Sequence, residues 1–305
     1  LSYECNSGGC GGCKFELLQG EVETLWADAP GLNERDRRRG RHLACQCRAK
    51  GPLSIKASTA KEYVPKVVPQ RQKAQLVGIS DITHDLREFR FRSTGGANFL
   101  PGQFAMLDLA GLDASRAYSL SNTANDDGEW HFQVRRVPHG KGTHVLFDKL
   151  ACGDEIGLDG PYGVAWLRTE SPRDIVCVAG GSGLAPMVSI ARGAAEAGML
   201  KDRKLYFFYG ARTPRDVCGQ DMLAQLEGFG DRIVYLPVVS LPGDDGEWQG
   251  ETGFVHDLVA RALPGSLAGF EFYFAGPPPM TQALQEMLMV GHRVPFEQIH
   301  FDRFF

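Results

Sequence analysis

The sequence has no long apolar run, no excess of positive charge and no internal repeat. Its longest stretch without a charged residue, from Ile175 to Ala191, is interrupted by glycines and a proline. That stretch is shorter than the about 20 apolar residues that a membrane-spanning helix needs. The 33 Lys and Arg against 37 Asp and Glu give a formal charge of −4, which argues against nucleic-acid binding through bulk electrostatics. The composition therefore excludes membrane, collagenous and disordered classes and predicts neither a membrane nor a nucleic-acid partner.

Several common functional signals are also missing. There is no His-Glu-x-x-His motif, and the eight histidines are dispersed, so a histidine-based metal site has no support. No apolar signal peptide precedes the first cysteine, and the eight cysteines are not spread along the chain as a disulfide framework would be. We therefore expect a cytoplasmic protein. What the sequence does have is glycine, 37 of 305 residues, which indicates many tight turns and close backbone approaches to ligands.

The cysteines gather near the start of the chain. The pattern Cys5-x4-Cys10-x2-Cys13 is the plant-type [2Fe–2S] spacing, which needs one distant fourth cysteine, here Cys45 or Cys47. Glycines between the first three allow a tight loop whose N–H groups can donate to sulfur. A zinc knuckle is the alternative, but zinc sites prefer C-x2-C pairs on both sides. The spacing favours an iron–sulfur cluster.

The cysteine loop and the segment Leu43-Ala44-Cys45 resemble the plant-type ferredoxin module. In that family the cysteine after a Leu-(Ala/Thr) pair is a ligand, although spacing alone leaves a swap with Cys47 open. Ferredoxin modules carry a hairpin and a helix before the first cluster cysteine, so we expect that part of the module to be missing from this sequence. The resemblance implies these metal ligands: Cys5, Cys10, Cys13 and Cys45.

Composition and rhythm divide the chain into four segments. Residues 1–57 carry a net +2 and the remainder −6, and the basic run Arg35–Arg41 is either a solvated turn or a patch that guides an acidic redox partner. Prolines without periodicity predict a linker over 58–70. Short β-rich segments and one short helix predict an antiparallel barrel over 71–167. Strands alternating with helices predict a parallel α/β domain over 168–305.

Two motifs in the barrel indicate a flavin. The Arg-Ala-Tyr-Ser segment at 116–119 resembles the Arg-x-Tyr-Ser signature of the ferredoxin–NADP⁺ reductase superfamily. There the arginine pairs with the flavin pyrophosphate, the tyrosine stacks on the isoalloxazine and the serine can hydrogen-bond N5. A Gly-Lys-Gly-Thr segment at 140–143 opens a helix, where a phosphate can bind. The resemblance implies FAD, with Tyr118 and Ser119 at the reacting ring and these cofactor-binding residues: Arg116, Tyr118, Ser119, Gly140, Lys141, Gly142 and Thr143.

Two motifs in the α/β domain indicate a pyridine nucleotide. A glycine-rich loop lies between a predicted strand and helix, where the helix N-terminus can meet a pyrophosphate. It resembles the superfamily's Gly-Gly-(Ser/Thr)-Gly loop, and 275–280 resembles its Cys-Gly-Pro-Pro-x-Met segment, with Ala275 replacing the cysteine. We expect slower or differently tuned hydride transfer from that replacement. The implied nucleotide-binding residues are Gly180, Gly181, Ser182, Gly183, Gly276, Pro277, Pro278 and Met280.

Coenzyme preference depends on the segment after the next strand. Asp216 could accept hydrogen bonds from ribose hydroxyls and repel a 2′-phosphate, whereas Arg212 or Arg215 could pair with that phosphate. Resemblance to NADH-using reductases favours NADH. At the end of the chain, Phe304 and Phe305 either close the core or cover the second flavin face as catalytic residues.

Together these motifs predict a multidomain α+β and α/β protein: a β-grasp-like [2Fe–2S] ferredoxin module, an antiparallel flavin-binding β-barrel and a parallel α/β nicotinamide-binding domain. NADH delivers two electrons together, a flavin can release them singly, and a [2Fe–2S] cluster carries one. The whole chain resembles reductase components of bacterial toluene/phenol monooxygenases, which implies a Rieske ferredoxin or a di-iron hydroxylase as partner. Two alternatives are the reductase of a Rieske ring-hydroxylating dioxygenase and a non-catalytic redox sensor.

Overall fold

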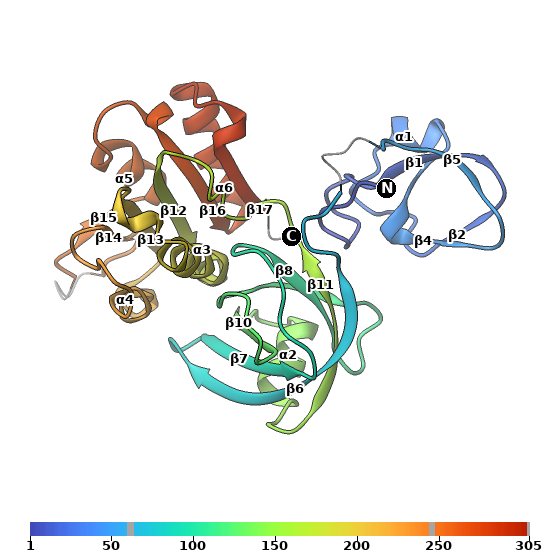
Figure 1. Ribbon diagram of the computed structural model, residues 1–305, viewed down its shortest axis with the longest axis horizontal. Coiled ribbons are helices and arrows are strands. Elements are labelled where there is room, and N and C mark those ends of the chain that lie inside the picture. Colours follow the sequence, from blue (N-terminus) through green and yellow to red (C-terminus); the bar gives the residue numbers. More distant parts are fainter. Residues whose placement is uncertain (60–63, 244–247, 304–305) are drawn as a thin grey trace.

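The structure of the protein is a computed structural model that describes residues 1–59, 64–243 and 248–303. Figure 1 shows three parts in chain order: a small part with short strands, an antiparallel sheet, and a parallel sheet flanked by helices. We call them the cluster segment (1–57), the barrel (β6 to β11) and the parallel domain (β12 to β17). The predicted fold class is confirmed. No helix in the described ranges is long and apolar enough to cross a membrane.

The cluster segment consists of two small antiparallel sheets and a short helix. The bounds are β1 (Lys14–Gln19), β2 (Val22–Thr24), α1 (Glu34–Arg38), β3 (Arg41–Leu43), β4 (Cys47–Ala49) and β5 (Ser54–Lys56). β1 lies between β3 and β5, and β2 pairs with β4. Few apolar side chains are buried here, and the buried Asp36 carboxylate instead pairs with Lys14 Nζ at 2.8 Å and Arg41 Nη1 at 2.9 Å. These pairs tie α1 to β1 and β3.

The barrel is a six-stranded antiparallel sheet in the order β10-β7-β6-β11-β8-β9. The bounds are β6 (Gln70–Asp81), β7 (Leu86–Ser93), β8 (Phe104–Asp108), β9 (Arg116–Ser119), β10 (Glu129–Arg135), α2 (Lys141–Asp148) and β11 (Glu155–Tyr162). Alternation along β7 buries Phe89 and Phe91 and exposes the residues between and after them. One antiparallel bridge between Leu120 and Phe132 joins the two edges of the sheet, and Leu146 of α2 packs into the same core.

The parallel domain is a six-stranded sheet in the order β15-β14-β13-β12-β16-β17, with every pair parallel. The bounds are β12 (Asp174–Gly180), α3 (Leu184–Glu196), β13 (Leu205–Ala211), α4 (Gln220–Ala224), β14 (Ile233–Val239), β15 (Glu251–Thr252), α5 (Val255–Ala262), β16 (Phe270–Gly276), α6 (Pro278–Gln285) and β17 (Ile299–Arg303). The two-residue β15 carries no hydrophobic signal, so the sequence does not predict it. A π-helical turn over Glu286–Gly291 continues α6.

Helix α3 lies directly on the barrel. The fully buried Ser189 accepts a hydrogen bond from Gly102 N at 3.2 Å and donates one to Asn122 O at 2.7 Å. One turn on, Arg192 donates to the Ser121 carbonyl at 2.8 Å. A Cβ on Gly193 would overlap the ring of Pro101, so the backbone of α3 touches the barrel there. Because Ser121 and Asn122 directly follow β9, α3 is attached to the strand that carries the predicted flavin motif.

Candidate functional site

Four cysteines of the cluster segment form two pairs, Cys5 with Cys10 and Cys13 with Cys45. The Sγ atoms of Cys13 and Cys45 lie 3.4 Å apart, which brings the distant cysteine to the loop. The backbone N–H of Cys10 donates to Cys5 Sγ at 3.3 Å, and the N–H of Gly12 donates to Cys10 Sγ at 3.3 Å. Hydrogen bonds of this kind stabilise thiolates, the form that binds iron. This donor set fits the predicted [2Fe–2S] cluster.

The backbone around Gly31 packs against the cysteine loop. Gly31 N donates to Gly8 O at 2.9 Å, and a Cβ on Gly11 would come 2.7 Å from Gly31 O. Gly11 has φ +75°, so a side chain there would be strained as well as obstructed. The contact with the Cys10 side chain, supported by backbone N–H groups, lowers the pKa of Cys5 to about 4. In each cysteine pair one thiol, Cys5 or Cys13, has a lowered pKa, and its partner, Cys10 or Cys45, has a raised one.

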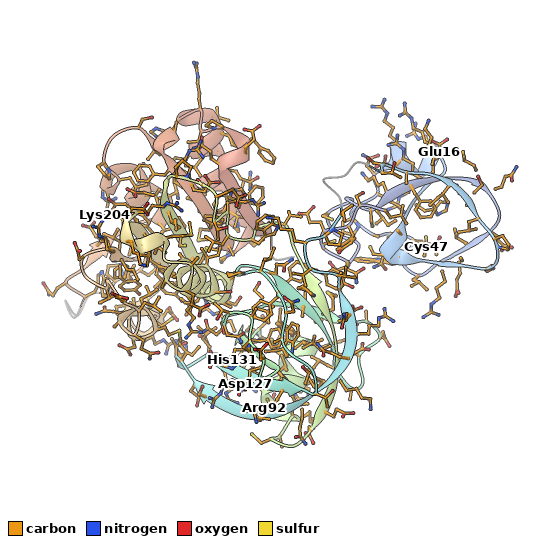
Figure 2. All side chains as sticks on the ribbon, in the orientation of Figure 1. Glu16, Cys47, Arg92, Asp127, His131 and Lys204 are labelled. Atoms are coloured by element: carbon orange, nitrogen blue, oxygen red, sulfur yellow. The ribbon has the colours of Figure 1, made fainter. Side chains whose placement is uncertain are left out.

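Cys47 lies apart from this group. It is the first residue of β4, directly opposite Thr24 of β2, and Figure 2 shows it on the sheet side of the cluster segment. Burial raises the pKa of Cys47. In a regular strand, side chains two residues apart project to the same side. Cys45 lies in the 3-10 turn over Ala44–Gln46 and Cys47 begins β4, so this rule does not apply to them.

The predicted flavin residues come together where β9 meets the start of α2. A Cβ on Gly142 would lie 2.8 Å from Tyr118 Oη and 3.3 Å from Arg116 Cγ, so the absence of a side chain lets strand and helix approach. Burial raises the pKa of Tyr118 to about 12, so its hydroxyl keeps its proton at neutral pH. Ser119 is buried and paired in register with Phe104 of β8. This arrangement of a cation, a ring and a hydroxyl fits a flavin.

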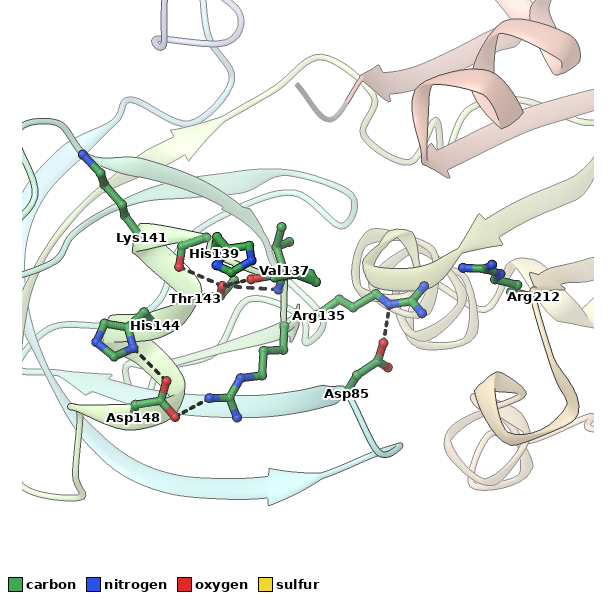
Figure 3. Close-up of a pocket in the computed structure, with 12 residues that line it drawn as sticks. Asp85, Arg135, Val137, His139, Lys141, Thr143, His144, Asp148 and Arg212 are labelled. Carbon is green, nitrogen blue, oxygen red and sulfur yellow. Dashed lines mark hydrogen bonds and ion pairs between the residues drawn. The ribbon is translucent and has the colours of Figure 1, made fainter.

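A cavity of about 920 Å³ opens beside this site (Figure 3). Its walls include Gly140, Lys141 and Thr143 from the barrel and Arg212 from the parallel domain. The Thr143 hydroxyl is used within the turn, because it donates to the carbonyls of Val137 and Gly140. The remaining walls are basic and acidic side chains and backbone: Asp85, Arg135, Arg136, Val137, Pro138, His139, His144 and Asp148. The cavity is therefore lined by cations and by the N-terminus of α2.

The predicted nucleotide loop is packed too tightly for side chains. A Cβ on Gly183 would overlap the Ala275 carbonyl, and one on Gly180 would lie 2.7 Å from Met280 Sδ. A Cβ on Gly276 would likewise come 2.6 Å from Met280 Cε. The ends of the neighbouring strands β12 and β16 thus meet at the start of α3. Ser182 lies in the 3-10 turn that opens α3, and Pro277 and Pro278 are the N-cap and first residue of α6.

Asp216 takes part in a group of ion pairs between the barrel and the parallel domain. One carboxylate oxygen accepts from Thr213 N at 2.9 Å and from Thr213 Oγ1 at 2.7 Å. The other lies 3.5 Å from Arg135 Nη2 and 3.7 Å from His84 Nε2, both of the barrel. Arg135 also donates to Asp85 at 2.6 Å. The sequence does not predict this group, because nothing in the local pattern pairs 216 with 84 or 135.

Three family models match consecutive segments of the chain. They describe a 2Fe-2S iron-sulfur cluster binding domain over 1–50, an oxidoreductase FAD-binding domain over 73–166 and an oxidoreductase NAD-binding domain over 177–286. The chain belongs to the ferredoxin–NAD(P)⁺ reductases that carry their own [2Fe–2S] domain. This reductase is an oxidoreductase, and FAD, a nicotinamide coenzyme and a [2Fe–2S] cluster are its cofactors.

Named relatives of this reductase cover nearly all of it. Ferredoxin–NAD(P)⁺ reductase CarAd of Metapseudomonas resinovorans is 44% identical over 99% of this chain and 90% of its own length. The ferredoxin–NAD⁺ reductase component of the alkene monooxygenase system of Xanthobacter autotrophicus is 37% identical over 100% of this chain and 91% of its own. A solved structure of the ferredoxin reductase in carbazole 1,9a-dioxygenase matches with a TM-score of 0.90 and 41% identity, covering 100% of this chain and 89% of that one.

Two predicted residues of the reductase, Phe304 and Phe305, lie outside the described residues. Ala275, which replaces the family's cysteine, is fully buried between Ala179 and Asp302 in the sheet. Sequence reasoning missed Ser189 and Arg192, whose polar character in an apolar helix is the only available signal. It also gave no role to Tyr3, although an aromatic residue two positions before the first cysteine is visible in the pattern.

Proposed function

We propose that the chain takes a hydride from NADH and delivers single electrons to a Rieske ferredoxin or to the di-iron hydroxylase of a toluene/phenol-type aromatic monooxygenase. The observation that carries the order of the carriers is the position of the barrel. Arg135 of the barrel lies beside Gly181 of the nucleotide loop, with Nη1 3.2 Å from where a Cβ would be, and Tyr162 of the barrel contacts Tyr3 of the cluster segment. The barrel, which carries the proposed flavin site, therefore contacts both the parallel domain and the cluster segment.

The bound groups supply two-electron acceptance and one-electron release, and the chain supplies binding and orientation. We assign Cys5, Cys10, Cys13 and Cys45 as the cluster ligands, because Cys5 interacts with Cys10 and Cys13 Sγ lies 3.4 Å from Cys45 Sγ, whereas Cys47 pairs with Thr24 across the β2–β4 sheet. We assign Arg116 and the 140–143 segment to the flavin pyrophosphate, on the basis of their contact at Gly142. We assign Tyr118 and Ser119 to the isoalloxazine, on which the Tyr118 ring would stack and to which the Ser119 hydroxyl would donate a hydrogen bond.

We assign the glycines at 180, 181, 183 and 276, with Ser182, Pro277, Pro278 and Met280, to the coenzyme pyrophosphate and nicotinamide. Support comes from the close packing of these residues at the start of α3. For the adenosine end, Arg212 lines the cavity and Asp216 is buried in ion pairs. NADH remains our proposed coenzyme. Phe304 and Phe305, outside the described residues, stay predicted covers of the second flavin face.

The domain boundaries stay predictions as well. In the structure β5 ends at Lys56, β6 begins at Gln70 and β12 begins at Asp174, and these positions support a linker over 58–70 and a junction near 167/168. We also propose a cytoplasmic location, supported by the cofactor set.

A second candidate function has a specific observation in its favour. The relative at 44% identity and the solved structure at 41% carry names of reductases, the latter in carbazole 1,9a-dioxygenase. The reductase component of a Rieske ring-hydroxylating dioxygenase would use the same three cofactors in the same order. The relative from an alkene monooxygenase system, at 37%, supports the monooxygenase class. Electron delivery to purified partner proteins of each class distinguishes the two.

An anaerobic titration with NADH tests the common part of both candidates. We expect bleaching of the flavin band and then of the cluster band, with a rhombic [2Fe–2S] electron paramagnetic resonance signal. A parallel titration with NADPH should require far higher concentrations. Flavin bleaching without a cluster signal would refute the carrier sequence, and a preference for NADPH would refute our coenzyme assignment.

A further inference from the structure

The side chain of Tyr3 packs against two apolar clusters that belong to different parts of the molecule. The first is in the cluster segment and consists of Cys13, Ala29 and Leu43 with Leu32, Ala44 and Cys45 around them. The second is in the barrel and consists of Phe104, Met106 and Tyr162. The rings of Tyr3 and Tyr162 meet edge to face, with centroids 5.7 Å apart and planes at 83°. Tyr3 thus joins the cluster segment to the barrel.

The position of Tyr3 relates this contact to both redox sites. Tyr3 lies two residues before Cys5, at the entrance to the cysteine loop. On the barrel side, Tyr162 packs against Phe104 with centroids 6.1 Å apart, and Phe104 pairs in register with Ser119. A short series of packed side chains therefore leads from the cysteine loop to the flavin strand β9.

The ring of Tyr3, and not its hydroxyl, makes the contact. Tyr3 Oη is buried and has no hydrogen-bond partner among the described residues, whereas Tyr162 Oη donates to Asp159 Oδ1 at 2.8 Å. A buried hydroxyl without a partner opposes folding. The favourable part of the contact between Tyr3 and the barrel therefore comes from the ring. Edge-to-face aromatic pairs are favourable beyond the area they bury. A phenylalanine should therefore serve equally well.

We propose that Tyr3 is a positioning residue that holds the iron–sulfur loop against the flavin barrel and thereby sets the rate of electron transfer between them. This rests on the function proposed above, because it requires a flavin and a cluster at the assigned sites. Electron transfer slows steeply as donor and acceptor separate. Removing the ring from either side of the contact lets the cluster segment move away while leaving the nucleotide and flavin sites intact.

The test compares four variants in the full reconstituted chain. Tyr3→Ala and Tyr162→Ala remove the contact from its two sides, Tyr3→Phe keeps the ring, and Trp26→Ala removes an exposed aromatic residue of the same segment. In stopped flow with NADH we expect unchanged flavin bleaching in all four. Cluster reduction should slow by about tenfold or more in the two ring-removing variants, the scale on which small misplacements act. Tyr3→Phe and Trp26→Ala should match the wild type.

A second measurement does not depend on turnover. Hydrogen–deuterium exchange of peptides covering 103–106 and 160–163 should become faster in Tyr3→Ala and Tyr162→Ala, because the barrel surface under Tyr3 is uncovered. Exchange should be unchanged in Tyr3→Phe and Trp26→Ala. Iron and labile sulfide per chain should equal the wild-type content in every variant.

Several outcomes would overturn the proposal. Wild-type cluster reduction and exchange in both ring-removing variants would do so, as would equal slowing in Trp26→Ala. If Tyr3→Ala loses iron, Tyr162→Ala decides, because Tyr162 lies in the barrel and away from the cysteines. Failure of the wild-type chain to pass electrons from flavin to cluster would instead refute the proposed function, so the two failures are distinguishable.

Discussion

The barrel is attached to its two neighbours by different kinds of contact. Towards the parallel domain the contact is polar and buried: Ser189 bonds two backbone groups and Arg192 a third, while Gly193 lies against Pro101. Towards the cluster segment the contact described above is an aromatic pair, Tyr3 with Tyr162. Hydrogen bonds are directional, whereas an aromatic edge tolerates some rotation and sliding.

This difference matches what each transfer requires. A hydride moves between atoms in contact, so nicotinamide and flavin must be held in one geometry. A single electron needs proximity but no alignment of bonds. On the proposed function, the attachment of α3 next to β9 would serve hydride transfer, and the aromatic contact would allow the cluster segment to reach both the flavin and an external partner.

The largest effect should come from removing a proposed cluster ligand in the cluster segment. Cys45→Ser should abolish the [2Fe–2S] absorption and the paramagnetic signal, because Cys45 Sγ is the atom that meets Cys13 Sγ. Reduction of the flavin by NADH should survive, since the α3 attachment is untouched. Cys47→Ser is the matched control and should keep a full complement of iron. Retention of the cluster in Cys45→Ser together with its loss in Cys47→Ser would reverse the assignment.

The next largest effect concerns the closely packed nucleotide loop of the parallel domain. A methyl group on Gly183 would overlap the Ala275 carbonyl, so Gly183→Ala must push β16 away from the start of α3. We expect flavin reduction by NADH to fall by about 100-fold, the effect of a misplacement near 1 Å. Gly269→Ala, where nothing lies within 4 Å, should behave as the wild type in stopped flow. Normal reduction in Gly183→Ala would show that the loop does not position the coenzyme.

A third change weakens the polar attachment without touching either loop. Ser189→Ala leaves the buried Gly102 N–H and Asn122 carbonyl without their partner, which should lower the free energy of unfolding by about 1–3 kcal/mol. Chemical denaturation measures this loss. The exposed Ser266→Ala, between α5 and β16 of the parallel domain, should change stability by less than about 0.5 kcal/mol. Equal effects of the two substitutions would contradict the role of Ser189.

The three domain types could be predicted from the sequence because each carries a motif made of neighbours in the chain. The cysteine loop, the 116–119 segment and the glycines at 180–183 are local patterns, and the three domain types follow from them. Contacts between domains depend on where distant segments come to lie, so Ser189, Tyr3 and the pairing of Asp216 with Arg135 left no local pattern to read. The strand β15 was missed for a related reason, since two polar residues gain their pairing only from β14.

The smallest effect concerns the charge between the barrel and the parallel domain. Burial alone would raise the pKa of Asp216, but the hydrogen bonds from Thr213 and the charge of Arg135, with His84 nearby, lower it overall. A carboxyl whose pKa is lower when folded stabilises the fold above its unfolded pKa of about 3.9 and loses that contribution as the pH falls further. Asp85, which also faces Arg135, opposes part of this gain.

Asp216→Asn keeps an acceptor for Thr213 and removes only the charge. We expect the variant to be less stable than the wild type by about 0.5–1 kcal/mol at pH 6, the range of partly exposed ion pairs, and this difference should shrink as the pH falls below about 3.9. Urea denaturation across this range measures the difference. If the gap between the two proteins does not close on acidification, the ion pair does not stabilise the interface. If stability is unchanged while the preference for NADH over NADPH falls, Asp216 contacts the coenzyme ribose instead. The polar attachment between the barrel and the parallel domain would then depend on α3 alone.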